Sequence, residues 1–265
     1  MEKSSSPSSS CPKKKIDGRV AIVTGGASGI GEETVHRFVE HGAFVVIADI
    51  QDERGQALVS TLGLNNCAYV HCDVSDEDQV SSLVNSTVER HGRVDIMFSN
   101  AGIINPNQDI LGFDIPMYDR LFGVNVRGTI ACVKHAARAM VEGGVRGSII
   151  CTASVVASMG YPEQIDYVMS KHAVLGLVRS AAKGLGQHGI RVNCASPGPM
   201  GTSLLRGLLG LGEGEVESHF EPFSQLKGVL KVHHVADAVV FLASDEAEFI
   251  TGHNLAVDGC FRSDN

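Results

Sequence analysis

The sequence predicts a single α/β domain built on a doubly wound parallel sheet with helices on both faces. Its strand-like segments are short and continuously apolar, as strands covered on both faces must be. They alternate along the chain with segments of helical periodicity. Residues 16–260 contain no internal repeat and no linker, so one domain accounts for the 265-residue chain.

The expected elements follow from the apolar runs and the helical patterns taken in order. We expect strands at residues 19–24, 43–49, 68–73, 94–99, 147–153, 190–196 and 254–257. We expect helices at residues 30–41, 76–91, within 117–141, and at 167–186 and 235–242. Ligands of such sheets bind beyond the carboxyl ends of the strands, so the chemistry is expected at that edge.

Composition argues against several classes of partner. The net charge of −8 disfavours nucleic acid and anionic membranes as main partners. The absence of Trp and the low aromatic content disfavour base-stacking surfaces. No apolar run approaches the roughly 20 residues of a membrane span, so no membrane partner is expected.

Residues 1–15 are rich in Ser and Pro and end in three lysines, without the apolar core of a secretory signal. A transit peptide is one alternative, but a disordered tail is favoured because the first strand begins close behind it. The seven cysteines form no C-x-x-C pair and are odd in number. We therefore expect no disulfide framework and a reducing compartment such as the cytoplasm. We also expect no metal site, because His233 and His234 are adjacent rather than four residues apart.

A glycine-rich segment joins the first strand to the first helix. Its residues are Thr24-Gly25-Gly26-Ala27-Ser28-Gly29-Ile30-Gly31. Gly25 permits a tight turn, Gly29 lets the backbone approach a pyrophosphate, and Gly31 lets helix and strand pack closely. The helix N-terminus offers free N–H groups to phosphates. The alternative is an ordinary β-α turn, which the strand before and the helix after make less favoured.

Asp49 ends the second strand, where a carboxylate can accept hydrogen bonds from the two ribose hydroxyls of NAD. It would repel the 2′-phosphate of NADP by about 4 kcal/mol at 4 Å and an effective dielectric of 20. No Arg or Lys follows before Arg54, and none lies in the glycine-rich segment. The prediction is NAD rather than NADP, and the alternative is a turn aspartate without a ligand.

Tyr167 and Lys171 are four residues apart, on one face of a predicted helix. A nearby ammonium and a bound nicotinamide cation can each lower the pKa of a tyrosine, which can then exchange a proton with an alcohol or a carbonyl. Ser154 follows the fifth strand and could hold the substrate oxygen, and Asn125 could tie a water chain to Lys171. Taken singly, Ser154 could equally be a loop serine and Asn125 a satisfied helix residue.

These pieces together resemble the short-chain dehydrogenase/reductase family over residues 16–260. The resemblance rests on Thr24–Gly31, Cys72-Asp73-Val74, Ser99-Asn100-Ala101-Gly102, Asn125, Ser154, Tyr167 with Lys171, and Pro197-Gly198 with Thr202. It implies a Rossmann-type fold, a homotetramer or homodimer, and a catalytic tetrad of Asn125, Ser154, Tyr167 and Lys171. The expected cofactor-binding residues are Gly25, Ser28, Gly29, Ile30, Gly31, Asp49, Ile50, Asp73, Val74, Asn100, Ala101, Gly102, Tyr167, Lys171, Pro197 and Thr202.

A closer resemblance is to plant secondary-metabolism members that act on monoterpenoids or lignans, of the isopiperitenol, borneol and nepetalactol-related types. It is carried by the segments 151–154, 166–171, 172–180 and 241–246. The chain departs from the family pattern at Ser99, where Asn is commoner, at Met200, where a small β-branched residue is usual, and at Cys260, where Gly is usual. Of these only Met200 lies near the expected substrate pocket.

The segment 199–230 is expected to cover the substrate as an apolar lid with glycine hinges at Gly201, Gly207 and Gly210. The alternative is a helix packed on the body or at a subunit interface. The expected substrate residues are Ser154, Met159, Tyr161, Met200 and Leu204. Glu213, Glu215 and Glu217 are expected to face water, so the predicted substrate is a small apolar alcohol or ketone.

Three functions are consistent with these patterns. The first is an NAD-dependent dehydrogenase that oxidises a secondary alcohol or lactol, of the monoterpenoid or iridoid class. The second is a cyclase of the nepetalactol type, which keeps NAD bound and closes a ring without net redox. The third is an NAD-binding scaffold without catalysis, which the complete Tyr–Lys–Ser set disfavours.

Overall fold

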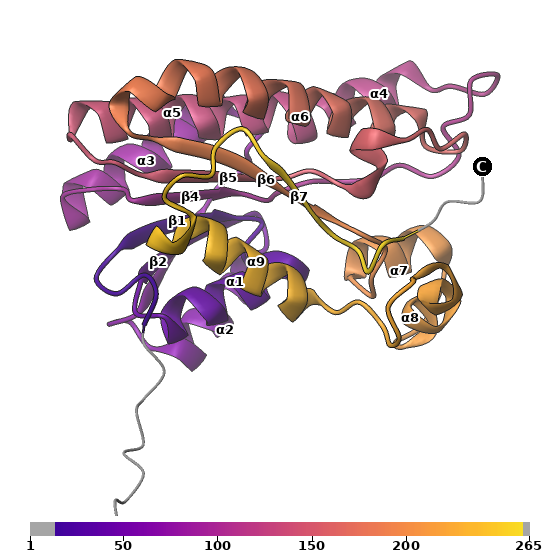
Figure 1. The fold of residues 1–265 in the computed structure, drawn as a ribbon, viewed down its shortest axis with the longest axis horizontal. Coiled ribbons are helices and arrows are strands. Elements are labelled where there is room, and N and C mark those ends of the chain that lie inside the picture. The colour runs from indigo at the N-terminus through magenta and orange to yellow at the C-terminus, as the bar shows by residue number, and fades with distance from the viewer. Residues whose placement is uncertain (1–13, 262–265) are drawn as a thin grey trace, which may run out of the picture.

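Seven parallel strands form one sheet in the order β3-β2-β1-β4-β5-β6-β7 in the computed structural model, which describes residues 14–261 (Figure 1). The strands are β1 (Val20–Thr24), β2 (Phe44–Asp49), β3 (Cys67–His71), β4 (Ile96–Ser99), β5 (Ser148–Thr152), β6 (Arg191–Pro197) and β7 (Asn254–Val257). The strand order reverses between β1 and β4, which places a topological switch point at the middle of the sheet. The predicted doubly wound sheet is confirmed.

Helices cover both faces of the sheet (Figure 1). One layer holds α3 (Glu77–His91), α5 (Thr129–Glu142) and α6 (Ile165–Leu185), and the other holds α1 (Gly29–Glu40), α2 (Asp52–Leu62) and α9 (Val232–Ala243). All but α2 were expected from the sequence within a few residues. Helix α2 buries only Gly55, Leu58 and Val59, so its apolar stripe is too narrow to give a strong periodic signal.

The long helix expected within residues 117–141 is two helices joined by a π-helical turn. Helix α4 (Ile115–Phe122) runs into the π-helical turn η1 (Gly123–Gly128), which continues directly into α5. A π-helical turn is less favourable than an α-helix and is frequent at functional sites. Here it contains the buried Asn125.

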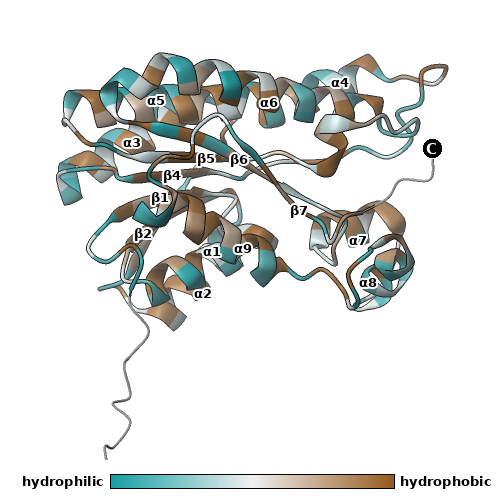
Figure 2. Ribbon diagram, in the orientation of Figure 1, coloured by the Kyte–Doolittle hydropathy of each residue, from teal (hydrophilic) through white to brown (hydrophobic). Residues whose placement is uncertain are grey.

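The strands divide their side chains between two apolar layers, one on each face of the sheet. In β1, Ile22 packs into the layer beneath α3, α5 and α6, whereas Ala21 and Val23 pack into the layer beneath α1 and α9. Figure 2 shows the hydrophobic residues along the central strands, while hydrophilic residues lie on the outer faces of the helices. The strands are therefore covered on both faces, as their continuous apolar sequences require.

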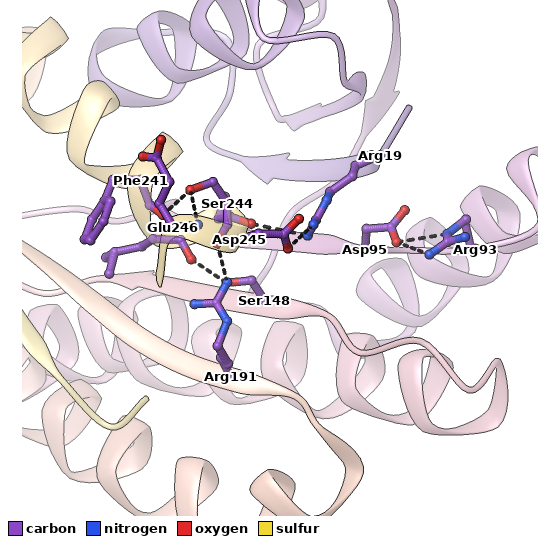
Figure 3. A network of polar contacts seen from close by, with 11 residues as sticks. Arg19, Arg93, Asp95, Ser148, Arg191, Phe241, Ser244, Asp245 and Glu246 are labelled. Atoms are coloured by element: carbon purple, nitrogen blue, oxygen red, sulfur yellow. Dashed lines mark hydrogen bonds and ion pairs between the residues drawn. The ribbon is translucent and has the colours of Figure 1, made fainter. Parts of the chain in front are cut away.

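A polar network fixes the amino-terminal edge of the sheet to the end of α9 (Figure 3). The Ser148 hydroxyl donates to the carbonyl of Leu242 at 2.9 Å, and the Arg191 guanidinium donates to the carbonyl of Ser244 at 3.1 Å. Arg19 forms an ion pair with Asp245 in the same network. These contacts satisfy carbonyls at the helix end and leave the opposite edge of the sheet for ligands.

The segment after β6 forms a separate lobe of short helices beside the carboxyl edge of the sheet (Figure 1). It contains α7 (Ser203–Leu209), α8 (Glu215–Phe220) and the short helical turn η4 (Glu221–Phe223). Most of the expected N-terminal tail lies outside the described residues, but Lys15 is described and its ammonium lies 2.8 Å from the Glu246 carboxylate. Within residues 14–261, no helix combines the length and the apolar character needed to cross a membrane.

Candidate active site

One cavity of about 1090 Å³ lies at the carboxyl edge of the sheet and extends from the glycine turn to the lobe of α7 and α8. It brings together most of the residues selected from the sequence. The predicted residues that line it are Gly25, Ser28, Gly29, Ile30, Asp49, Ile50, Asp73, Val74, Asn100, Ala101, Gly102, Ser154, Met159, Tyr161, Tyr167, Lys171, Pro197, Met200, Thr202 and Leu204. Gly31 and Asn125 do not line it, and both lie directly behind its wall.

The glycine turn, residues 24–31, packs closely against neighbouring backbone because its glycines carry no Cβ. The missing side chains also leave room for a ligand beside the turn. Gly25 has a positive φ of +62°, and a Cβ there would lie 2.9 Å from the Cα of Ala101. A Cβ on Gly31 would overlap the carbonyl oxygen of Gly25, so Gly31 holds α1 against the turn. Ser28 precedes the helix without capping it through its side chain. The N–H groups of the first turn are therefore available to an anion, which suits a pyrophosphate.

Asp49 is buried at the end of β2, with 5% of its surface exposed. One carboxylate oxygen accepts the N–H of Ala27 at 3.0 Å, and the other accepts the N–H of Gln51 at 3.0 Å. The hydroxyl of Tyr69 donates to the Asp49 carbonyl at 2.6 Å. The carboxylate is thus fixed against the glycine turn and presents a localised negative charge to the cavity.

Asn100 joins the ends of three neighbouring strands. Its backbone N–H donates to the Thr24 hydroxyl at 3.0 Å, and its side-chain amide donates to the Thr24 carbonyl at 3.1 Å. Its side-chain oxygen accepts the hydroxyl of Thr152 at 3.0 Å. These bonds hold the ends of β1, β4 and β5 together at the switch point, where Asn100 and Thr152 line the cavity.

Tyr167 and Lys171 lie on the first turns of α6, facing the cavity. The Lys171 ammonium donates to the Thr152 carbonyl at 2.8 Å and lies 5.4 Å from the centroid of the Tyr167 ring. Burial lowers the pKa of Lys171 to about 8. Burial raises the pKa of Tyr167 to about 12, and a hydrogen bond with Ser154 counters part of that rise.

The lowering of the Tyr167 pKa by Lys171 together with a bound nicotinamide cation remains a prediction. The helical spacing places the two side chains together as predicted, but the ammonium is directed toward the carbonyl of Thr152. Burial of the phenol outweighs every other influence on its pKa. Desolvation cannot be read from residue spacing, because it depends on what the rest of the chain packs around the group.

Ser154 starts the short helical turn η2 (Val155–Ser158), and its hydroxyl accepts the N–H of Val156 at 3.4 Å. The residue is 8% exposed and faces the same cavity as Tyr167. Because the long bond to Val156 uses only one lone pair, the hydroxyl retains capacity to bond another oxygen. This position suits a group that orients a substrate oxygen.

Asn125 supports the site from behind rather than from within the cavity. Its side-chain oxygen accepts the N–H of Ile103 at 2.8 Å, and its amide donates to the Ile103 carbonyl at 2.9 Å and the Ser170 hydroxyl at 3.2 Å. It therefore ties the chain after β4 to α6. The predicted water chain from Asn125 to Lys171 remains a prediction.

The lobe supplies the apolar part of the cavity. Met159, Tyr161, Met200 and Leu204 line it as expected, and Met200 is 3% exposed. Sequence reasoning did not select other lining residues, among them Ile103, Arg120, Arg127, Val155, Val156, His219 and Phe261. The two valines follow Ser154 directly and could have been inferred from that adjacency. No local sequence pattern indicates that Phe261 lines the cavity, because it does so only when the C-terminal segment packs against the lobe.

One expectation for the lobe needs correction. Glu213 and Glu215 are exposed as expected, but one carboxylate oxygen of Glu217 is buried and has no hydrogen-bond partner among the described residues. The Glu217 carboxylate lies where a Cβ on Gly201 would be, so Gly201 is a packing position beneath α8. All three glutamates were expected to face water, but α8, a helix of six residues, turns one carboxylate inward.

The described residues 14–261 hold no cluster of three or more His, Cys, Asp or Glu side chains arranged to bind a metal ion. The polar groups of the cavity are instead hydrogen-bonding and acid–base groups around a nucleotide-type turn. Such an arrangement can bind a dinucleotide and exchange a proton with a second ligand.

Comparison with known proteins agrees with this geometry. Residues 25–261 match a family model described as enoyl-(acyl carrier protein) reductase. Short-chain dehydrogenase reductase 3b of Arabidopsis thaliana is 49% identical over 247 residues, covering 93% of this chain and 96% of the relative. The (−)-isopiperitenol/(−)-carveol dehydrogenase, mitochondrial, of Mentha piperita is 53% identical over 249 residues, covering 93% and 94%.

A third relative carries a different type of name. The (+)-cis,trans-nepetalactol synthase NEPS1 of Nepeta racemosa is 51% identical over 250 residues, covering 93% of this chain and 92% of the relative. This chain and these relatives align over nearly their whole lengths, with about half of the residues identical. The parallel sheet and the site of Tyr167, Lys171 and Ser154 agree with the same family. The chain belongs to the short-chain dehydrogenase/reductase family, among plant relatives that include monoterpenoid dehydrogenases and nepetalactol synthases.

Proposed function

We propose that this enzyme is an NAD-dependent dehydrogenase that oxidises a small apolar secondary alcohol or lactol of the monoterpenoid or iridoid class. One observation carries the proposal. A single cavity joins the glycine turn, the acid–base pair Tyr167 and Lys171, and an apolar lobe. A nucleotide and an apolar alcohol bound in that cavity would meet at Tyr167.

The residues present suit NAD. The glycine turn and the start of α1 would hold the pyrophosphate, and Asp49 would accept the ribose hydroxyls. NAD supplies the hydride acceptor when bound. A 2′-phosphate placed about 4 Å from the fixed Asp49 carboxylate would be repelled by about 4 kcal/mol at an effective dielectric of 20, which favours NAD over NADP.

Three side chains would handle the substrate hydroxyl. Ser154 orients its oxygen, and Tyr167 accepts its proton during oxidation or returns one during reduction. Lys171 lies 5.4 Å from the phenol ring centroid, where its positive charge favours the phenolate needed for oxidation. Burial raises the pKa of Tyr167 to about 12 although the hydrogen bond with Ser154 opposes that rise, so any further positive charge brought into the cavity would assist the same step.

The substrate class follows from the lining of the lobe. The side chains that face the cavity from the lobe are mainly aliphatic or aromatic, and Met200, together with Met159 from the segment between β5 and α6, can adapt to an irregular apolar shape. The mint relative is named as a dehydrogenase of isopiperitenol and carveol, which are apolar alcohols. The residues of α7 and α8 that line the cavity include the polar Ser203 and His219 but no lysine or arginine, so they supply no fixed positive charge for a sugar phosphate or an acyl carrier.

The test is oxidation of a panel of monoterpene alcohols and lactols by the purified protein with NAD+, followed by NADH absorbance and gas chromatography. Tyr167→Phe should lower kcat/KM by about 10² to 10⁴ while NAD+ binding persists, because the ring is retained and only the proton-transfer group is lost. A Tyr167→Phe variant with unchanged turnover would overturn the proposal. A non-catalytic scaffold would keep its function in that variant.

A non-redox cyclase is the second candidate, because relatives at 51% and 53% identity are named nepetalactol synthases. The Ser154 and Tyr167 hydroxyls that stabilise an alcohol oxygen could equally stabilise an enol oxygen during ring closure. The two candidates differ in electron balance. Cyclisation gives a product of unchanged composition and no NADH, whereas oxidation gives one NADH for each product.

Assembly and location are further proposals. We propose a homodimer or homotetramer, since Ile130 of α5 and Met169 of α6 are each 45% exposed on the outer helical layer. Light scattering of the purified protein tests this. We also propose the cytoplasm, because the six cysteines within residues 14–261 are free thiols. The mint relative is named as mitochondrial, so imaging of a fluorescent fusion of the full chain decides between the two compartments.

A further inference from the structure

We propose that Phe261 completes an aromatic wall with Phe220 and Phe223, and that this wall limits the size of the substrate. This inference rests on the proposed function, because it concerns the apolar alcohol that the cavity would accept. Phe261 lies near the end of the chain, and no sequence motif points to it. The structure places it in the cavity that holds Ser154 and Tyr167.

The three phenylalanines form a triangle. The ring centroids of Phe220 and Phe261 are 6.1 Å apart, those of Phe223 and Phe261 are 6.1 Å apart, and those of Phe220 and Phe223 are 6.3 Å apart. All three rings line the cavity, and these separations are typical of interacting aromatic pairs. The rings therefore support one another and act as one surface.

Backbone hydrogen bonds hold the C-terminal segment against the lobe. The N–H groups of Gln225 and Leu226 donate to the Gly259 carbonyl at 2.9 and 3.2 Å, and the Ser224 hydroxyl donates to the same oxygen at 3.2 Å. A Cβ on Gly259 would overlap the Ser224 hydroxyl, so this close approach requires glycine. Figure 1 shows the chain after β7 reaching the lobe of α7 and α8.

The residue before Phe261 adopts a left-handed conformation that is costly for a side chain. Cys260 has a φ of +60°, and its N–H donates to the Asp258 carboxylate at 2.9 Å. This turn reverses the chain after β7 and brings the Phe261 ring back onto the lobe. A non-glycine residue in this conformation persists only where neighbouring contacts fix it, here the bonds to Gly259 and the ring packing of Phe261.

A compact cyclic alcohol is the substrate shape that this wall favours. Rigid rings on one side leave little freedom for the cavity to widen, in contrast to the flexible Met159 and the leucines of α7. An alcohol with a bulky group directed at the wall would have to displace Phe261 and its backbone clamp. Removing the ring of Phe261 should therefore admit larger substrates.

The experiment measures kcat/KM with NAD+ for 4-methyl-, 4-tert-butyl- and 4-cyclohexylcyclohexanol. Phe261→Ala should raise the ratio of kcat/KM for the cyclohexyl over the methyl alcohol by about 10-fold or more, the scale set by a few methylene groups in an apolar pocket. Phe261→Leu should give a smaller rise. Phe249→Ala is the matched control, because Phe249 is 99% exposed and does not line the cavity, and its ratio should equal that of the wild type.

An unchanged ratio in Phe261→Ala or Phe261→Leu, with normal NAD+ binding and thermal unfolding, would overturn the inference. If Phe261→Ala fails to fold, Phe261→Leu carries the test. If the wild type oxidises none of the alcohols, the dehydrogenase proposal fails, and calorimetric Kd values of the same alcohols with NADH present test the wall by itself. The ratio of those Kd values should then shift between wild type and Phe261→Leu, and equal ratios would refute the wall.

Discussion

Lys171 holds an ammonium group in a place where only 4% of the residue is exposed, and this burial should cost the protein stability. Burial lowers the pKa of Lys171 from an ordinary 10.5 to about 8. A difference of this size between unfolded and folded chains corresponds to about 3 kcal/mol. The hydrogen bond to the Thr152 carbonyl returns about 1 kcal/mol of that cost. Replacing Lys171 by methionine should therefore stabilise the fold at pH 7 by about 2 kcal/mol while abolishing activity.

The sign of the pH dependence follows from proton binding. Between pH 8 and pH 10.5 the unfolded lysine is protonated and the folded one is largely neutral, so the unfolded state binds more protons. The stability of the wild type should rise by about 3 kcal/mol through this window, so the advantage of Lys171→Met should fall from about 2 kcal/mol to about −1 kcal/mol, because only the lysine keeps the hydrogen bond to Thr152. Below pH 8 both states are protonated and the advantage stays constant.

Urea unfolding of the wild type and Lys171→Met without added nucleotide, at intervals from pH 7 to pH 10.5, gives these differences. Lys183→Met is the matched control, because Lys183 lies on the same helix and is exposed. The difference in the free energy of unfolding between Lys183→Met and the wild type should not vary from pH 7 to pH 10.5. A Lys171→Met variant that is less stable at pH 7, or whose advantage does not change with pH, would show that Lys171 is not desolvated as the geometry implies.

Three more changes test other parts of the site. Asp49→Ser should improve kcat/KM with NADP+ relative to NAD+ by at least about 10-fold, because it removes a repulsion of several kcal/mol, and an unchanged cofactor ratio would contradict the role of that charge. Gly31→Ala should abolish NAD+ binding or folding because its Cβ overlaps the glycine turn, whereas Gly176→Ala, a helical glycine with nothing within 4 Å of its added Cβ, should be neutral or stabilising by up to about 1 kcal/mol in thermal unfolding. Asn125→Ala should cost about 1–3 kcal/mol of stability by leaving buried partners such as the Ser170 hydroxyl unsatisfied, and a melting temperature equal to that of the wild type would refute that bonding pattern.

The nucleotide half of the site could be predicted from the sequence because its signals are local. The glycine turn and Asp49 follow strands whose apolar runs are evident, and a parallel sheet brings the carboxyl ends of neighbouring strands to one edge. Spacing on a helix was also enough to place Tyr167 beside Lys171. In each case a short stretch of chain fixes the geometry.

The remaining features depend on contacts between distant segments. Helix α2 was not predicted, and its Gly55 makes sense only because the ring of Tyr69, on β3, occupies the place of a Cβ. Asn125 was expected in a helix, but the π-helical turn and its bonds to Ile103 come from the packing of the whole layer. Phe261 reaches the cavity only because the C-terminal segment is clamped to the lobe. Neither the periodicity of a segment nor a short motif indicates these contacts, because they join residues that are far apart in the sequence.

The two halves of the cavity differ in how much sequence change they can tolerate. The nucleotide half is built on strand ends whose side chains and backbones interlock, as at Gly31 and Asn100, so a substitution there disturbs the sheet itself. The substrate half rests on short helices that contribute little to the core: α7 buries no residue, and α8 buries only Val216. Substitutions in the lobe can therefore reshape the pocket at small cost to folding.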